Sequence, residues 1–78
     1  MKLYFTKNDL IEALFSRNSK LVPVETDSRR TFYLAVSAVE REDGSGRSFN
    51  VKGTICTSED GLIPLSIIRK GIFHVVTR

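Results

Sequence analysis

The chain has 78 residues, a length that fits one domain with a small core, and 41% of them are hydrophobic, which is ordinary for a globular chain. Twelve basic and nine acidic residues give a net charge of +3, which permits contact with nucleic acid without requiring it. No apolar run approaches the roughly 20 residues that span a bilayer, and the N-terminus lacks a signal peptide's apolar region. The single cysteine, Cys56, excludes an internal disulfide and a cysteine-rich zinc site. We therefore expect one domain, residues 1–78, in a reducing cytoplasm.

The chain begins with an apolar run at residues 2–5, which is either a short strand or a lead-in. Thr6 and Asp9 then have the spacing of a capping box, in which each side chain bonds the backbone N–H of the other. We expect a helix over about residues 7–17. Its apolar stripe at helical spacing consists of Leu10, Ile11, Leu14 and Phe15. Because so short a helix is marginal alone, the stripe should dock on a sheet.

Residues 20–26 predict a strand, and Pro23 confines this strand to a sheet edge or a bulge because proline has no N–H to donate. A polar turn at residues 26–30 follows. The next segment, residues 31–57, is the longest alternating pattern in the chain and predicts a β-hairpin. The alternate positions that form its buried face are Phe32, Leu34, Val36, Ala38, Phe49, Val51, Gly53 and Ile55.

The Asp43-Gly44 pair suits a two-residue type I′ turn, because both central residues need positive φ. This turn would set Val36 opposite Val51 and Tyr33 opposite Thr54. A four-residue loop would keep the same faces in another register. Gly53 in mid-strand predicts a bulge or a sharp bend.

The C-terminal third predicts three further elements. Residues 57–61 predict a turn whose glycine takes the left-handed position of a three-residue loop. Residues 62–65 predict a short strand, which its proline marks as an edge strand. Residues 66–70 predict one helical turn, capped by a serine and stopped by a glycine. Residues 72–77 predict a last strand.

One helix and about five short antiparallel strands indicate an α+β domain, with the N-terminal helix packed on a curled sheet. The order of a long hairpin, a short strand, one helical turn and a closing strand resembles that of the small SH3-type and Sm-type barrels. The resemblance implies that the sheet curls toward a barrel.

Catalysis needs a nucleophile, base or metal held within reach of a partner. Cys56 and His74 are the one cysteine and the one histidine, so a Cys–His pair requires that the strands bring them together. Otherwise both are ordinary strand residues. Acidic side chains gather at residues 40–43 and 59–60, where they could bind a divalent ion but more often serve solubility and local hydrogen bonds. No phosphate-binding glycine motif occurs. We predict no enzyme, no metal, no cofactor and no small-molecule substrate.

Two surfaces are candidates for binding. On the outer face of the hairpin, an exposed Tyr33 beside Asn50 and Lys52 could meet a protein or stack a base, unless solvent or another strand covers this face. The second candidate is a basic rim that would neutralise phosphates if the sheet curls. Its members are Arg29, Arg30, Arg41, Arg47, Lys52, Arg69 and Lys70. The alternative is that these charges only solubilise the surface and protect sheet edges.

The thin core and the two proline-marked edges favour a non-catalytic protein-binding module, whose partner is another protein or a second copy of the chain. Such a module would suit a phage or mobile-element protein that modulates or inhibits a host protein complex. The alternative function is a small nucleic-acid-binding domain that uses the basic rim and Tyr33.

Overall fold

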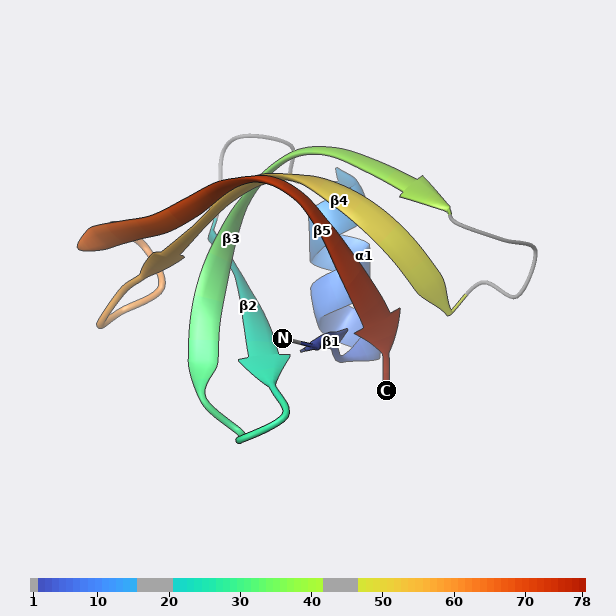
Figure 1. Cartoon of the computed structure of the whole chain (residues 1–78), viewed down its shortest axis with the longest axis horizontal. Helices are drawn as coiled ribbons and strands as arrows, with labels where there is room; N and C mark the ends of the chain where they lie inside the picture. Colours follow the sequence, from blue (N-terminus) through green and yellow to red (C-terminus); the bar gives the residue numbers. More distant parts are fainter. Residues whose placement is uncertain (1, 16–20, 42–46) are drawn as a thin grey trace.

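The computed structural model of the chain describes residues 2–15, 21–41 and 47–78, except for the side chains of Lys7, Leu10 and Glu12. The described part consists of strands and one helix (Figure 1). In chain order the elements are β1 (Leu3–Phe5), α1 (Lys7–Phe15), β2 (Leu21–Thr26), β3 (Thr31–Arg41), β4 (Ser48–Thr57) and β5 (Ser66–Thr77).

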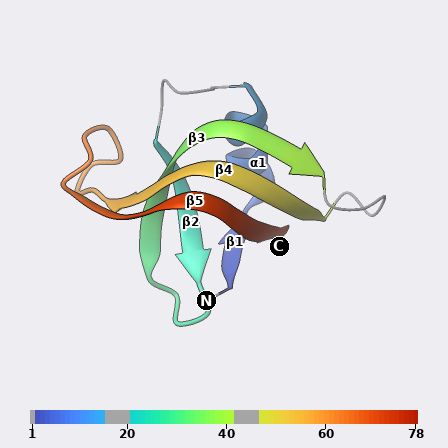
Figure 2. The same ribbon diagram turned by 45° about the horizontal axis from the view of Figure 1, so that its top comes forward.

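The five strands form a closed barrel in the order β1-β2-β3-β4-β5. Neighbouring strands are antiparallel except at the seam, where β1 runs parallel to β5 with Leu3 opposite Val75 and Phe5 opposite Thr77. The predicted α+β class, a helix packed on a curled antiparallel sheet, is therefore wrong, because the sheet closes on itself and strands make up nearly all of the fold. Figure 2 shows β3, β4 and β5 as long, curved strands beside the shorter β1 and β2.

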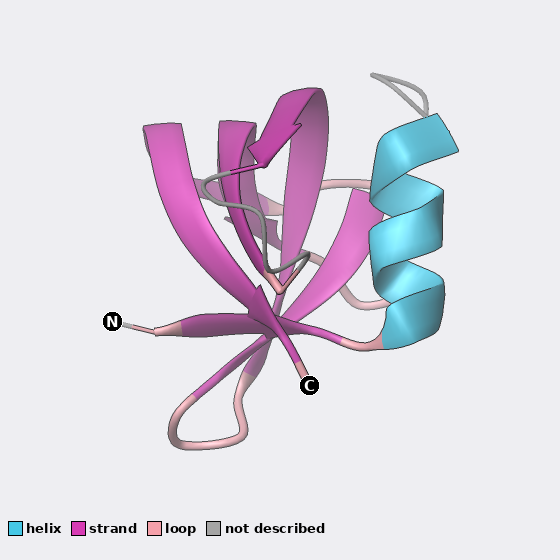
Figure 3. Ribbon diagram, turned by 90° about the vertical axis from the view of Figure 1, so that its right-hand side faces the viewer, coloured by secondary structure: helices cyan, strands magenta, loops and turns pink. Residues whose placement is uncertain are grey.

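Helix α1 stands beside the strands of the barrel (Figure 3). The capping box is confirmed: Thr6 N–H donates to Asp9 Oδ2 at 3.3 Å, and Asp9 N–H donates to Thr6 Oγ1 at 3.2 Å. Of the predicted apolar stripe, Ile11, Leu14 and Phe15 are exposed, so the predicted docking is wrong for these three residues. Among the described side chains of the helix Ala13 enters the core, and the side chain of Leu10 lies outside the described residues.

The predicted buried face of the hairpin is confirmed for most of its length. Phe49, Val51, Gly53 and Ile55 of β4 are buried together with Leu34 and Val36 of β3, and Phe32 is partly buried against them. The remaining buried members of the apolar core are Leu3, Phe5, Ala13, Val22, Val24, Phe73 and Val75. Among the described side chains, the core therefore draws on the barrel strands and, from the helix, on Ala13.

The predicted register of the hairpin is wrong by two residues at Val36, and a β-bulge in β3 shifts the pairing by one more residue at Ala38. Val36 lies opposite Gly53 and Ala38 lies opposite Lys52, so Ser37 is the extra residue between them. The Ser37 hydroxyl donates to the Lys52 carbonyl at 3.0 Å. Beyond the bulge Ala38 is exposed and Val39 packs against the core in its place. The bulge that Gly53 predicts is thus on the partner strand, and the predicted turn at residues 42–46 lies outside the described residues.

The predicted division of residues 62–77 into a strand, a helical turn and a second strand is also wrong. Residues 58–65 form a loop, and β5 then runs from Ser66 to Thr77 without interruption. The reason is that β4 extends to Thr57, which pairs with Ser66, so the backbone of residues 66–70 finds its hydrogen-bonding partners in β4 rather than in a helical turn.

Candidate interaction surface

The loop between β4 and β5 is held by its own hydrogen bonds. Asp60 Oδ1 accepts the backbone N–H groups of Leu62 at 2.9 Å and Ile63 at 3.2 Å. The Ser58 hydroxyl donates to the Ile63 carbonyl at 2.8 Å and accepts the Gly61 N–H at 2.9 Å. Gly61 has a φ of 73°, so its predicted left-handed conformation is confirmed, although the loop is longer than the predicted one. These bonds fix the path of the loop without any need for its apolar side chains to be buried.

The carboxyl group of Asp60 is tuned by the same bonds. The N–H groups of Leu62 and Ile63 favour the ionised carboxylate and lower the pKa of Asp60 below its usual value, against a smaller raising effect of burial. At neutral pH the loop is therefore closed around a charged acceptor, and charge-assisted hydrogen bonds are stronger than those between neutral groups.

Large apolar side chains cover this loop and the first half of β5. We call them the β5 surface, and each is between 49 and 76% exposed. Its members are Leu62, Ile63, Leu65, Ile67, Ile68 and Ile72. In Figure 1 the loop and the start of β5 extend to the left of the barrel. Exposed apolar side chains that are contiguous rather than scattered mark sites of interaction with another molecule.

The backbone of the same segment is unpaired on one side. β5 pairs with β4 from Ser66 to Val76, but its pairing with β1 is confined to residues 75–77, which lie opposite β1 from Leu3 to Phe5. Within the described parts of the chain, no strand pairs with the β1-side edge of residues 66–73. An unpaired edge presents N–H and C=O groups that another strand can bond.

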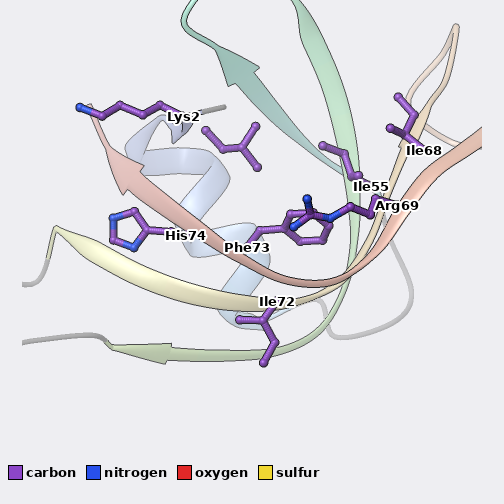
Figure 4. A pocket seen from close by; sticks show the side chains of 8 residues that line it. Lys2, Ile55, Ile68, Arg69, Ile72, Phe73 and His74 are labelled. Carbon is purple, nitrogen blue, oxygen red and sulfur yellow. The ribbon is translucent and has the colours of Figure 1, made fainter.

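A hollow of about 340 Å³ opens where β5 separates from β1 (Figure 4). Buried side chains of Leu3, Ile55 and Phe73 are among its lining. Arg69 lies at the hollow with its guanidinium carbon 5.1 Å from the centre of the Phe73 ring, a cation–π contact. Lys2 and His74 also line the hollow. It therefore combines an apolar interior with basic side chains.

The structure separates the residues of the predicted basic rim. Arg29 and Arg30 lie at the turn between β2 and β3, at the bottom of Figure 1, whereas Arg41 and Arg47 lie at the far ends of β3 and β4. The remaining members, Lys52, Arg69 and Lys70, lie on β4 and β5. No single rim collects all of these charges.

Lys52 and Lys70 of the predicted rim line one groove, of about 350 Å³, on the outer face of the sheet. Between them the floor of this groove carries the cross-strand pair Gly53 and Gly71. Asn50, the third polar residue predicted for this face, lies opposite His74 of β5 and is half-buried.

The predicted exposure of Tyr33 is wrong. Tyr33 is half-buried, it pairs with Cys56 rather than with the predicted Thr54, and the loop covers it at Gly61. A methyl group added to Gly61 would lie 3.2 Å from Tyr33 Cε1, so the ring and the loop backbone are in close contact. The tyrosine thus supports the loop instead of offering an open stacking face.

Cys56 and His74 do not form a nucleophile–base pair. Cys56 pairs with Ile67 and His74 pairs with Asn50, so seven residues of β5, roughly 20 Å of strand, separate the two positions. Cys56 is buried, and burial raises the pKa of its thiol. Over residues 2–15, 21–41 and 47–78, no group of three His, Cys, Asp or Glu side chains is placed to hold a metal ion.

In the same ranges, no helix is long and apolar enough to cross a membrane.

The β5 surface is the feature that the sequence analysis missed. The sequence predicts a short edge strand, a helical turn and a last strand for these residues, and none of these predictions indicates an exposed apolar surface. A signal was present in the run Gly-Leu-Ile-Pro-Leu-Ser-Ile-Ile, residues 61–68, where apolar residues are too dense to share one strand face. Comparison of the chain with known protein families, curated proteins and solved structures finds no match, so its function has to be inferred from this geometry.

Proposed function

We propose that the chain is a non-catalytic protein-binding module that contacts a partner protein through the β5 surface. The observation that carries the proposal is the exposure of six large apolar side chains between Leu62 and Ile72, half of them on a loop fixed by hydrogen bonds. A fixed loop supports binding because little conformational entropy is lost when its side chains become buried in an interface. A regulatory role, in which the module modulates a larger complex by occupying one of its subunits, is part of the same proposal.

Two features argue for a protein rather than a nucleic acid as the partner. The centre of a protein interface is apolar and depleted of charge, as are the loop residues Leu62, Ile63 and Leu65. Nucleic-acid binders instead concentrate Lys and Arg on one face, and here Arg29 and Arg41 lie on different parts of the barrel. The proposed function includes no catalysis, and the large separation of Cys56 from His74 supports this part of the proposal.

A matched pair of variants tests the proposal in a pull-down from the cells in which the chain is made. The double variant Ile63→Ser/Ile67→Ser removes apolar area from the β5 surface, while Ile11→Ser/Phe15→Ser removes exposed apolar area from α1. We expect the same partner protein to be retained by the natural chain and by the α1 variant, and to be reduced at least tenfold with the β5 variant. Equal retention by all three chains, or no specific partner at low stringency, would contradict the proposal.

A titration with nucleic acids tests the alternative function, a nucleic-acid-binding domain. The natural chain and the variant Arg29→Ala/Arg30→Ala are titrated with single- and double-stranded DNA and RNA at two salt concentrations. We expect no salt-sensitive micromolar binding. Binding that weakens with salt and is lost in the arginine variant would favour a nucleic-acid-binding domain instead.

A further inference from the structure

We propose that the unpaired edge of β5, residues 66–73, accepts an extended acidic segment of the partner protein as an added strand. This inference rests on the proposed function and specifies the partner's chemistry. The edge spans roughly 26 Å at about 3.3 Å per residue, which is as long as an ordinary strand or longer. Backbone hydrogen bonds to such an edge supply affinity, and pockets for alternate side chains supply specificity.

The hollow beside the edge provides such a pocket. It lies where β5 leaves β1, so an added strand that bonds β5 runs along its opening, and one face of that strand points into it. Leu3, Ile55 and Phe73 make the interior apolar, which fits one apolar side chain of the added strand. The exposed Ile68 borders the same hollow and would become buried with that side chain.

The charges around the edge select an acidic segment. Lys2, Arg69 and His74 are the ionisable residues that line the hollow, and none of its lining residues carries a carboxylate. Lys70 follows Arg69 on the edge and is exposed on the outer groove. Carboxylates on either face of the added strand would therefore meet basic side chains, and such complementarity both steers association and excludes wrong partners.

The same charges oppose a second copy of the chain as the occupant. If two β5 edges paired antiparallel over the whole of residues 66–73, the two-fold axis would pass between Arg69 and Lys70 and set Arg69 of each copy against Lys70 of the other. Like charges directly opposite each other destabilise a strand pair. Lysine on an edge strand is a common protection against this kind of self-association.

The probe for the test is a synthetic peptide with a fluorescein at its N-terminus, fluorescein-Glu-Val-Glu-Leu-Glu-Val-Glu-amide, with fluorescence anisotropy as the readout. We expect saturable binding that is at least tenfold tighter than that of the same peptide with Lys in place of Glu. The variant Arg69→Glu/Lys70→Glu should weaken binding of the acidic peptide at least tenfold. The matched control Arg29→Glu/Arg30→Glu, with the same change in charge at the turn between β2 and β3, should leave binding within twofold.

Two backbone-methylated versions of the acidic peptide distinguish strand addition from simple charge attraction. One carries N-methyl groups on the odd residues and the other on the even residues. Because only one set of N–H groups can point toward β5, we expect one version to lose binding and the other to retain it. Equal binding of both versions, or of the Glu and Lys peptides, would overturn the inference.

Failure of this inference can be told apart from failure of the proposed function. If the acidic peptide does not bind but the β5 variant Ile63→Ser/Ile67→Ser still loses the partner protein, the β5 surface is an interface without strand addition, and only the inference falls. Sedimentation of the natural chain tests whether a second copy occupies the edge. A dimer whose stability changes in the Arg69→Glu/Lys70→Glu variant would assign the edge to a second copy and would also overturn the inference.

Discussion

Gly53 of β4 lies directly against the backbone carbonyl of Ala35 in β3, so closely that a Cβ atom at position 53 would approach that oxygen to well under 3.0 Å. The contact lies beside the bulge at Ser37, where β3 bends over β4. A backbone oxygen cannot move aside as a flexible side chain can. The close approach therefore requires glycine, and the bend that it allows belongs to the curvature of the barrel.

We expect Gly53→Ala to destabilise the chain, because the strands must separate to admit the methyl group. Overpacking of this kind costs about 1–3 kcal/mol. For a domain of this size each kcal/mol lowers Tm by about 4–8 °C. Urea denaturation followed by circular dichroism measures the loss, and Thr54→Ala, the adjacent position on the outer groove, is the control. A Gly53→Ala midpoint equal to that of the natural chain would contradict the close packing of β3 on β4.

We expect Asp60→Ala to loosen the loop without unfolding the barrel. The carboxylate accepts the N–H groups of Leu62 and Ile63, so its removal should speed amide hydrogen exchange at these two positions. Glu59→Ala, one residue away, should leave both rates within twofold. Unchanged exchange in the Asp60→Ala chain would show that the loop has another support.

The loop should also respond to pH with a defined sign. Because the folded chain lowers the pKa of Asp60 from its ordinary value of 3.8, its contribution to loop stability is present above that value and is lost as the pH falls through the lowered pKa. Amide exchange at Leu62 and Ile63, corrected for intrinsic rates, should therefore lose protection only below about pH 4. Loss of protection between pH 5 and 7 would contradict this assignment.

We expect the Cys56 thiol to resist alkylation in the native chain. Its side chain is buried and its pKa is raised, so both access and the thiolate fraction are low. Labelling with iodoacetamide at pH 8, followed by mass spectrometry, should become rapid only in urea concentrations that unfold the barrel. Modification in native buffer at the rate of a free cysteine would contradict the buried position.

Local sequence patterns predicted those features of the fold that depend on residues close together in the chain. The capping box of Thr6 and Asp9 and the left-handed Gly61 follow from short-range geometry, and the buried faces of β3 and β4 follow from alternation. Closure of the barrel does not follow from local patterns, because the parallel pair of β1 and β5 joins residues 3–5 to residues 75–77. Gly53 predicted a bulge or a bend, but the position of the bulge at Ser37 on the partner strand escaped prediction, since no change in composition marks it.

The interaction surface escaped prediction for a different reason. Ser66 and Gly71 have the spacing of a helix cap and a helix stop, so the sequence predicts a helical turn where the structure has part of β5. Ile63 and Ile67 are exposed, and no periodicity distinguishes an apolar side chain that packs inside the chain from one that binds a partner. Only the three-dimensional arrangement separates these two cases.

The central claim, that β5 offers an open edge to a partner strand, is tested most directly by amide hydrogen exchange along residues 66–73, with and without a saturating amount of the acidic peptide. In the free chain we expect alternate N–H groups, those that face away from β4, to exchange fast, and we expect the same groups to become protected when the peptide binds. Protection of every residue in the free chain, or an unchanged pattern with the peptide bound, would contradict the claim.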